Sequence, residues 1–224
     1  MNENLIQQLF ADTQAAFAKA PIKKYAEANG HLWNYSISST RITEGANLII
    51  GFNWGASGNE PYKPQNEIPK ENFKELYDKN DLSSLQRIYL PLKQRFPAED
   101  IDNAMQTNFC FFRSKTEGEI TSEDLMLSTP LFQQLIHIVE PKRILAFSKK
   151  LQSYCIESAL CSDLEEASFP SNKRTLHTAK GNLKLNDTVV PIYFLPHPNA
   201  KFTSIARKKA WDFCFGSLGI KDEA

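Results

Sequence analysis

The sequence predicts an α/β protein, a three-layer α/β/α sandwich around a central, mostly parallel sheet of four strands. Four short apolar runs, closed by glycine or polar residues, are typical of buried strands; they cover residues 46–52, 107–114, 142–148 and 188–196. Segments with helical spacing separate these runs. Strands that alternate with helices favour a parallel sheet covered on both faces.

The helices follow from apolar spacing and from proline positions. Residues 3–20 are predicted as an amphipathic helix, with Ile6, Leu9, Phe10 and Phe17 at helical spacing. Further helical pieces are expected near 70–79, over 82–96 with an interruption at Pro91, over 122–141 with Pro130 in a first turn, over 149–160, and within 197–219.

Two segments late in the chain are predicted without a helix. Residues 161–174 are polar and are expected to form a loop. Residues 175–187 have the pattern of a β-hairpin that turns at Lys180-Gly181-Asn182.

Length and composition indicate one globular domain. The chain has 224 residues, of which 42% are hydrophobic and 23% charged. We expect a single domain over residues 1–224, with a core at about 46–212 and an N-terminal helical extension at 1–45. Lys plus Arg equals Asp plus Glu at 26 each, so a nucleic-acid partner would need a local basic patch.

The sequence also carries expectations about compartment and cofactors. Residues 1–20 lack the basic start and long apolar block of a signal peptide, and no window of about 18 apolar residues predicts a membrane span. We expect a cytoplasmic monomer. Cys110, Cys155, Cys161 and Cys214 form no CxxC pair, which predicts reduced thiols and neither a metal site nor a cofactor.

Three polar segments are expected at one edge of the sheet. In parallel sheets, ligands bind at the carboxyl ends of the strands. The first strand ends in GFNWGASG, the second in TNFCFFRSK, and the fourth is followed by PHPNAKF. Asn53 offers an acceptor and two donors that can hold a water. The amide of Asn108 suits the edge of a base, and His197, between two prolines, can aim an N–H at a developing negative charge.

Structural interpretations of the same residues stay open. The GFNWG segment can be a plain turn, Asn108 can be a strut that bonds backbone, and His197 can cap a loop carbonyl. The basic group formed by Lys201, Arg207, Lys208 and Lys209 suits phosphate contact, and it can equally be a solvated helix face.

Taken together, these segments resemble the uracil-DNA glycosylase superfamily over about residues 46–212. Gly51-Phe52-Asn53-Trp54-Gly55 is similar to the first motif, which reads G-x-N-P-G in the mismatch-specific and single-strand-selective branches. His197-Pro198-Asn199-Ala200-Lys201 is similar to the last motif, H-P-S-P-x, and Thr107-Asn108 fits the intermediate strand motif.

The resemblance implies a DNA glycosylase-like protein of base excision repair. Such a protein hydrolyses the N-glycosidic bond of uracil or a related damaged pyrimidine after flipping the nucleotide out of DNA. Asn53 matches the residue that positions water, Asn108 the reader of the pyrimidine edge, and His197 the residue that stabilises the leaving anion. The base pocket would include Gly51, Phe52, Trp54 and Gly55, and either Trp54 or Tyr62 would stack on the base. The DNA contacts would come from Asn199, Lys201, Arg207 and Lys208, with Lys201 at the position of the side chain that wedges into the duplex.

The sequence departs from the family pattern in three places. Trp54 replaces the proline of the first motif, and Asn199-Ala200 replaces Ser-Pro. Gly55 stands where the strict uracil-specific branch has a tyrosine that blocks the thymine methyl group. Two alternatives therefore stay open: a catalytically inactive glycosylase-fold protein that binds nucleic acid or a nucleotide, and a different α/β enzyme that acts on a nucleotide or another small ligand.

Overall fold

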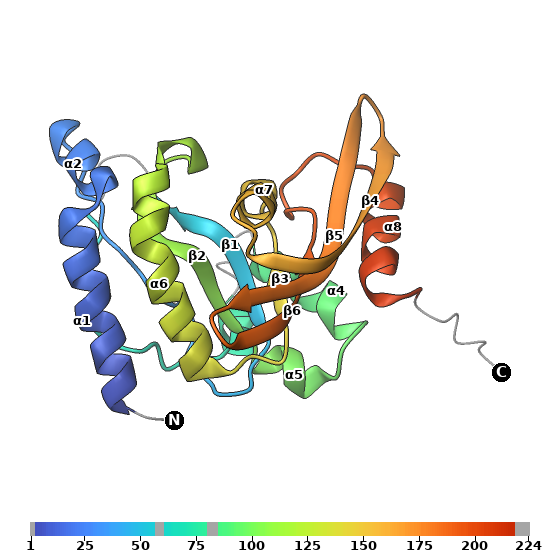
Figure 1. The fold of residues 1–224 in the computed structure, drawn as a ribbon. Coiled ribbons are helices and arrows are strands. Elements are labelled where there is room, and N and C mark those ends of the chain that lie inside the picture. The colour runs from blue at the N-terminus through green and yellow to red at the C-terminus, as the bar shows by residue number, and fades with distance from the viewer. Residues whose placement is uncertain (1–2, 57–60, 80–84, 218–224) are drawn as a thin grey trace.

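The computed structural model describes residues 3–56, 61–79 and 85–217, and a six-stranded mixed sheet lies at its centre (Figure 1). The strand order is β2-β1-β3-β6-β5-β4. Four neighbouring strands are parallel: β2 (Met105–Ser114), β1 (Leu48–Gly55), β3 (Ile144–Ala146) and β6 (Thr188–Phe194). The α/β class is confirmed. The four-stranded sheet was wrong, because two antiparallel strands, β5 (Arg174–Leu185) and β4 (Cys161–Ser171), extend the sheet beyond β6.

Helices cover both faces of this sheet (Figure 1). One face carries α1 (Glu3–Lys19), α2 (Pro21–Ala28), α6 (Ser122–Val139) and α7 (Lys149–Glu157). The other carries α3 (Phe73–Asp78), α4 (Tyr89–Lys93), α5 (Ala98–Asp102) and α8 (Ser204–Phe215). Two 3₁₀ turns, η1 (Gln86–Ile88) and η2 (Glu117–Glu119), complete the elements of the described residues. Within the described ranges, no helix combines the length and apolar character needed to cross a bilayer.

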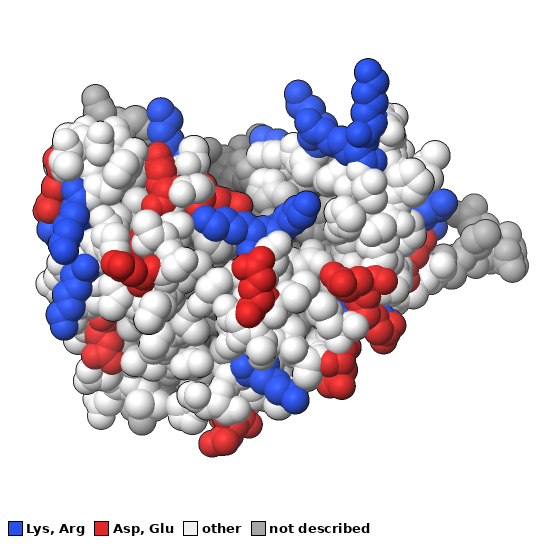
Figure 2. Space-filling model, turned by 45° about the horizontal axis from the view of Figure 1, so that its top comes forward, with Lys and Arg blue, Asp and Glu red and all other residues white. Residues whose placement is uncertain are grey.

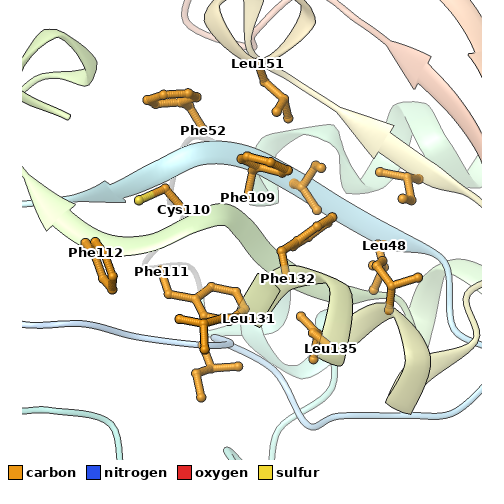
Figure 3. Close-up of a cluster of buried hydrophobic side chains, with 14 of the residues drawn as sticks. Leu48, Phe52, Phe109, Cys110, Phe111, Phe112, Leu131, Phe132, Leu135 and Leu151 are labelled. Carbon is orange, nitrogen blue, oxygen red and sulfur yellow. The ribbon is translucent and has the colours of Figure 1, made fainter. Parts of the chain in front are cut away.

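The parallel strands are apolar on both sides because each side packs against helices. Leu48 and Ile50 of β1 belong to the buried cluster beneath α6, whereas Ile49 between them belongs to the cluster beneath α3, α4 and α8. Figure 3 shows part of the first cluster, in which Phe109 of β2 and Phe132 of α6 meet with ring centroids 5.0 Å apart.

The N-terminal segment completes the same core. Helix α1 packs along α6 and buries its apolar stripe there, as its spacing predicted. The chain then runs along the outer edge of β2, where the Ser36 amide donates to the Phe111 carbonyl at 2.9 Å and Tyr35 bridges to Phe112. This covering leaves the β2 edge without a free row of backbone groups at these positions.

The predicted hairpin was wrong in both its ends and its turn. The expected loop at 161–174 contains strand β4, and β5 runs straight through Gly181 to a turn at Asn186–Asp187. A Cβ at Gly181 would lie 2.8 Å from the Ser162 carbonyl oxygen, beside a register shift in the β4–β5 pairing. Glycine therefore marks a close approach of two strands here. Strand β4 escaped prediction because an edge strand can be polar on most of its surface.

The prolines of two helices also behave differently from expectation. Pro130 lies inside α6, so its first-turn placement was wrong; the Met126 carbonyl loses its helical partner there, and Met126 is 72% exposed. Pro91 sits in the first turn of α4, where its missing N–H removes no helical bond. The segment expected as a helix from residue 82 begins outside the described residues.

Candidate functional site

A pocket of about 470 Å³ opens where the carboxyl ends of β1, β2, β3 and β6 meet. It is lined by parts of the three motif segments, by further residues of β2 and the loop after it, and by Leu85 and Phe147: Gly51, Phe52, Asn53, Trp54, Gly55, Leu85, Gln106, Asn108, Ser114, Lys115, Thr116, Glu117, Phe147 and His197. The structure thus brings Asn53, Asn108 and His197, which lie far apart in the sequence, to one cavity.

Asn108 lines this pocket with an amide that has no hydrogen-bond partner in the described part of the chain. Its residue is 5% exposed, and it stands on β2 directly opposite Gly51 of β1. A Cβ at Gly51 would lie 2.5 Å from Asn108 Oδ1, so only glycine leaves room for this side chain. A buried amide without a hydrogen bond is unfavourable unless a ligand or water completes it. The Asn108 amide is therefore available for a hydrogen bond to a ligand or a water in the pocket.

Asn53 is held in a defined orientation. Its Nδ2 donates to the Trp54 carbonyl at 3.0 Å and to Ser114 Oγ at 2.8 Å, and the Ser114 hydroxyl donates onward to the Thr116 carbonyl at 2.6 Å. Because the hydroxyl gives its only proton to Thr116, it must accept from Asn53. The acceptor Oδ1 is thereby left for a ligand or a water.

His197 is held as a neutral ring. Its Nδ1 accepts a hydrogen bond from the Asn199 amide at 3.2 Å, which places the proton of the neutral ring on Nε2. Burial lowers the pKa of His197 below its ordinary value of 6.5, and the positive charge of Arg207 lowers it further. The pocket therefore faces an imidazole that donates one N–H at neutral pH.

Arg207 fixes the loop that carries this histidine. Its Nη1 donates to the His197 carbonyl at 3.2 Å, and its Nη2 donates to the Pro198 carbonyl at 3.1 Å and to the Ala200 carbonyl. One guanidinium thus joins three carbonyls of the His-Pro-Asn-Ala segment to helix α8. Burial lowers the pKa of this guanidinium. The positive charge of Arg207 is therefore directed at carbonyls of the protein itself.

The other residues predicted to touch DNA have mixed surroundings. Asn199 Oδ1 accepts from Arg87 Nη1 at 3.2 Å, Lys208 pairs with Asp212 at 2.6 Å, and Lys201 is exposed on the loop. Figure 2 shows basic side chains along the upper edge of the molecule, with acidic side chains among them and below. No continuous basic band crosses the face in this view.

A second pocket, of about 550 Å³, lies behind the histidine loop between α4 and α8. Its cations are engaged within the protein: Arg95 donates to Asp212 at 2.7 Å and to the Gly216 carbonyl at 2.9 Å, and Arg207 and Lys208 are used as described. No unpartnered buried amide faces it among the described residues. We take the smaller pocket, which holds the unpartnered Asn108, as the candidate site.

The aromatic residues divide between the pocket and its support. Trp54 lines the pocket, whereas Tyr62 lies outside it and stacks on the Arg113 guanidinium at 4.5 Å. Arg113 also stacks on Trp54 at 5.7 Å and donates to the Gly55 carbonyl at 2.9 Å. This stack supports the GFNWG segment from the side of β2. Phe52 is buried, with Lys150 Nζ 4.6 Å from its ring centroid.

Sequence reasoning did not single out four residues of this site: Phe147, Ser114, Glu117 and Arg113. Phe147 is an aromatic wall that follows β3, and its place at the end of the third apolar run was the available signal. Ser114 lies at the end of β2, within the expected rim segment TNFCFFRSK, and Glu117 lies two residues beyond that segment.

No protein-family model matches this sequence, and no curated protein shows significant similarity to it. The likeness to the uracil-DNA glycosylases rests on the three short segments alone.

Proposed function

We propose that this protein binds a pyrimidine base flipped out of DNA in the candidate site and hydrolyses its N-glycosidic bond. The observation that carries the proposal is the convergence of an unpartnered buried amide, an oriented amide oxygen and a neutral histidine on one cavity of about 470 Å³. Aromatic and polar walls together suit a planar ligand with a hydrogen-bonding edge.

Each group has a separate task in this scheme. The Asn108 amide, which can both donate and accept, bonds the edge of the base. Nε2–H of His197 donates to the base oxygen as negative charge builds on the leaving base, so it stabilises the transition state more than the ground state. Oδ1 of Asn53 accepts from a water and orients it toward the sugar carbon.

The electrostatics of the histidine support this scheme. An imidazolium would protonate the base and lose its acceptor at Nδ1, where the Asn199 amide now donates. A neutral ring donates without carrying a proton into the reaction. The lowered pKa keeps the ring in this form at neutral pH.

A second candidate is a protein that binds a nucleotide or nucleic acid without base release. The internal use of Arg207 and Lys208 favours the nucleotide over a DNA strand as the ligand, because two of the predicted phosphate contacts are already engaged. The equal numbers of acidic and basic residues, 26 each, point the same way. Trp54 in place of the motif proline also favours it.

The deciding experiment measures base release. The purified protein is mixed with single- and double-stranded oligonucleotides that carry one uracil, and abasic sites are cleaved with hot alkali. Asn53→Ala and His197→Ala are expected to reduce release by about 10²–10³-fold. His137→Ala on the exposed face of α6 serves as the matched histidine control and should leave release unchanged.

The contrary outcomes separate the candidates. DNA binding without release on either substrate would make the protein a binding module. Binding of free nucleotides with no response to DNA would make it a small-ligand protein. Release that survives both substitutions would remove Asn53 and His197 from the mechanism.

A further inference from the structure

A carboxylate that belongs to none of the three motif segments lines the candidate site. Glu117 begins the 3₁₀ turn η2 that follows β2, and it faces the same cavity as Asn53, Asn108 and His197. The cap of that turn uses other groups, since Thr116 and Glu119 bond each other reciprocally. The Glu117 side chain is thus not needed to close its own turn.

The position of Glu117 is fixed from the side of α7. Ser148 Oγ donates to Glu117 Oε1 at 3.1 Å, and Lys150 Nζ donates to the Glu117 carbonyl and, at 3.2 Å, to the Ile120 carbonyl. These bonds hold the backbone and one carboxylate oxygen. The second oxygen, Oε2, accepts no hydrogen bond from the described residues.

Glu117 is also linked to the residue that orients the water. From Asn53 Nδ2 a hydrogen bond leads to Ser114 Oγ, and from Ser114 another leads to the Thr116 carbonyl, next to Glu117 in the chain. Asn53 and Glu117 therefore stand on one connected wall of the pocket. Among the described residues that line the pocket, Glu117 is the only carboxylate, and so the only acidic side chain that can serve as a base for a water oriented by Asn53.

We propose that Glu117 is the general base of this site, an inference that rests on the proposed hydrolysis. As the bond between C1′ and the base nitrogen breaks, its electron pair leaves with the base, whose anion accepts from His197 Nε2–H. The water oxygen bonds to C1′, and its proton passes to Glu117 Oε2. Glu117 then returns this proton to solvent or to the departing base, so that charge and atoms balance. A positioned base of this kind contributes about 10²–10⁴-fold to a rate.

The competing interpretation is that Glu117 only anchors the loop to α7 through Ser148. Both interpretations predict a weaker enzyme after substitution, so the pH dependence must separate them. The titratable groups around Glu117 are Lys115 and Glu119 on its own loop, Lys150 on α7 and His197 across the pocket. A general base gives the rate an acid limb that disappears when the carboxyl group is removed, whereas an anchor leaves the limb in place.

The experiment measures single-turnover base release between pH 4.5 and 8 on a saturating uracil oligonucleotide. Glu117→Gln, which keeps an acceptor for Ser148, is expected to lower the plateau rate by about 10²-fold and to remove the Glu117 part of the acid limb. Glu117→Asp should recover part of the rate and restore the limb. Glu119→Gln is the matched control from the same loop and should stay within about twofold of wild type. Thermal unfolding of each variant reports whether the loop is intact.

The outcomes of the two proposals stay distinct. If wild type releases base and Glu117→Gln matches it in rate and pH profile, the general-base role is overturned and the glycosylase proposal stands. A slower Glu117→Gln enzyme with an unchanged acid limb would assign Glu117 to anchoring and also overturn the role. If wild type releases no base while still folded, the glycosylase proposal fails and takes this one with it.

Discussion

The loop after β6 and the segment at the end of β1 deliver their polar groups to the same pocket by different means. His197 depends on a clamp from a distant element, because Arg207 of α8, ten residues on, holds three carbonyls of its loop. Asn53 depends on its neighbour strand, because Ser114 of β2 receives its amide. In this protein a loop outside the sheet is fixed by a multidentate cation, whereas the strand residue is fixed by one bond to a side chain of the neighbouring strand.

This comparison predicts that substitutions in α8 change the position of His197 and leave the position of Asn53 unchanged. The largest effect is expected for Arg207→Ala, which frees three carbonyls and lets the imidazole move. We expect release to fall by about 10²-fold, since a displacement of about 1 Å can have that effect. The free energy of unfolding should fall by about 1–3 kcal/mol. Single-turnover kinetics and urea titration measure the two effects.

Lys208→Ala is the control for this substitution. It removes the next cation on α8; the Lys208 side chain is 65% exposed, so its pair with Asp212 contributes at most about 1 kcal/mol. Equal losses of release for the two variants would mean that α8 acts through general positive charge. The clamp would then have no special role.

A smaller effect is expected on the β1 side. Ser114→Ala removes one of two acceptors for the Asn53 amide, which keeps its bond to the Trp54 carbonyl. Release should fall about fivefold, in line with one hydrogen bond of about 1 kcal/mol. Ser114→Thr retains the hydroxyl and should stay near wild type in the same kinetic assay.

The double variant sharpens the comparison. If the two segments are held independently, the losses from Arg207→Ala and Ser114→Ala add in free energy. A double variant no worse than Arg207→Ala alone would show that Asn53 and His197 are coupled, and the contrast between the two regions would fail.

The smallest effect concerns protonation. Burial is the larger cause of the lowered pKa of His197 and the Arg207 charge the smaller, so Arg207→Gln should raise this pKa while leaving it below 6.5. In wild type the folded state stays neutral while the unfolded histidine protonates, so His197 makes stability fall as the pH drops from about 6.5 to the folded pKa. Imidazole shifts in an NMR titration measure both pKa values. A downward shift in Arg207→Gln would contradict the assigned cause.

The parallel half of the sheet was predictable because its strands are buried on both faces. Continuous apolar runs closed by polar residues are typical of strands that lie between two layers of helices, and β1, β2, β3 and β6 all lie within or close to the expected ranges. The antiparallel half was not predictable in this way. Strand β4 alternates half-exposed and exposed positions, and Gly181 was interpreted as a turn although the neighbouring strand requires it.

The sequence by itself determined the α/β class, the four central strands and the rim to which Asn53, Asn108 and His197 belong. These features follow from local patterns, because the polarity of consecutive residues predicts which segments are buried and where each strand ends. Only the tertiary structure decided that Arg207 closes the histidine loop, that Gly51 makes room for Asn108 and that Glu117 enters the pocket. Each of these contacts joins different elements, and no periodicity along the chain encodes a contact across it.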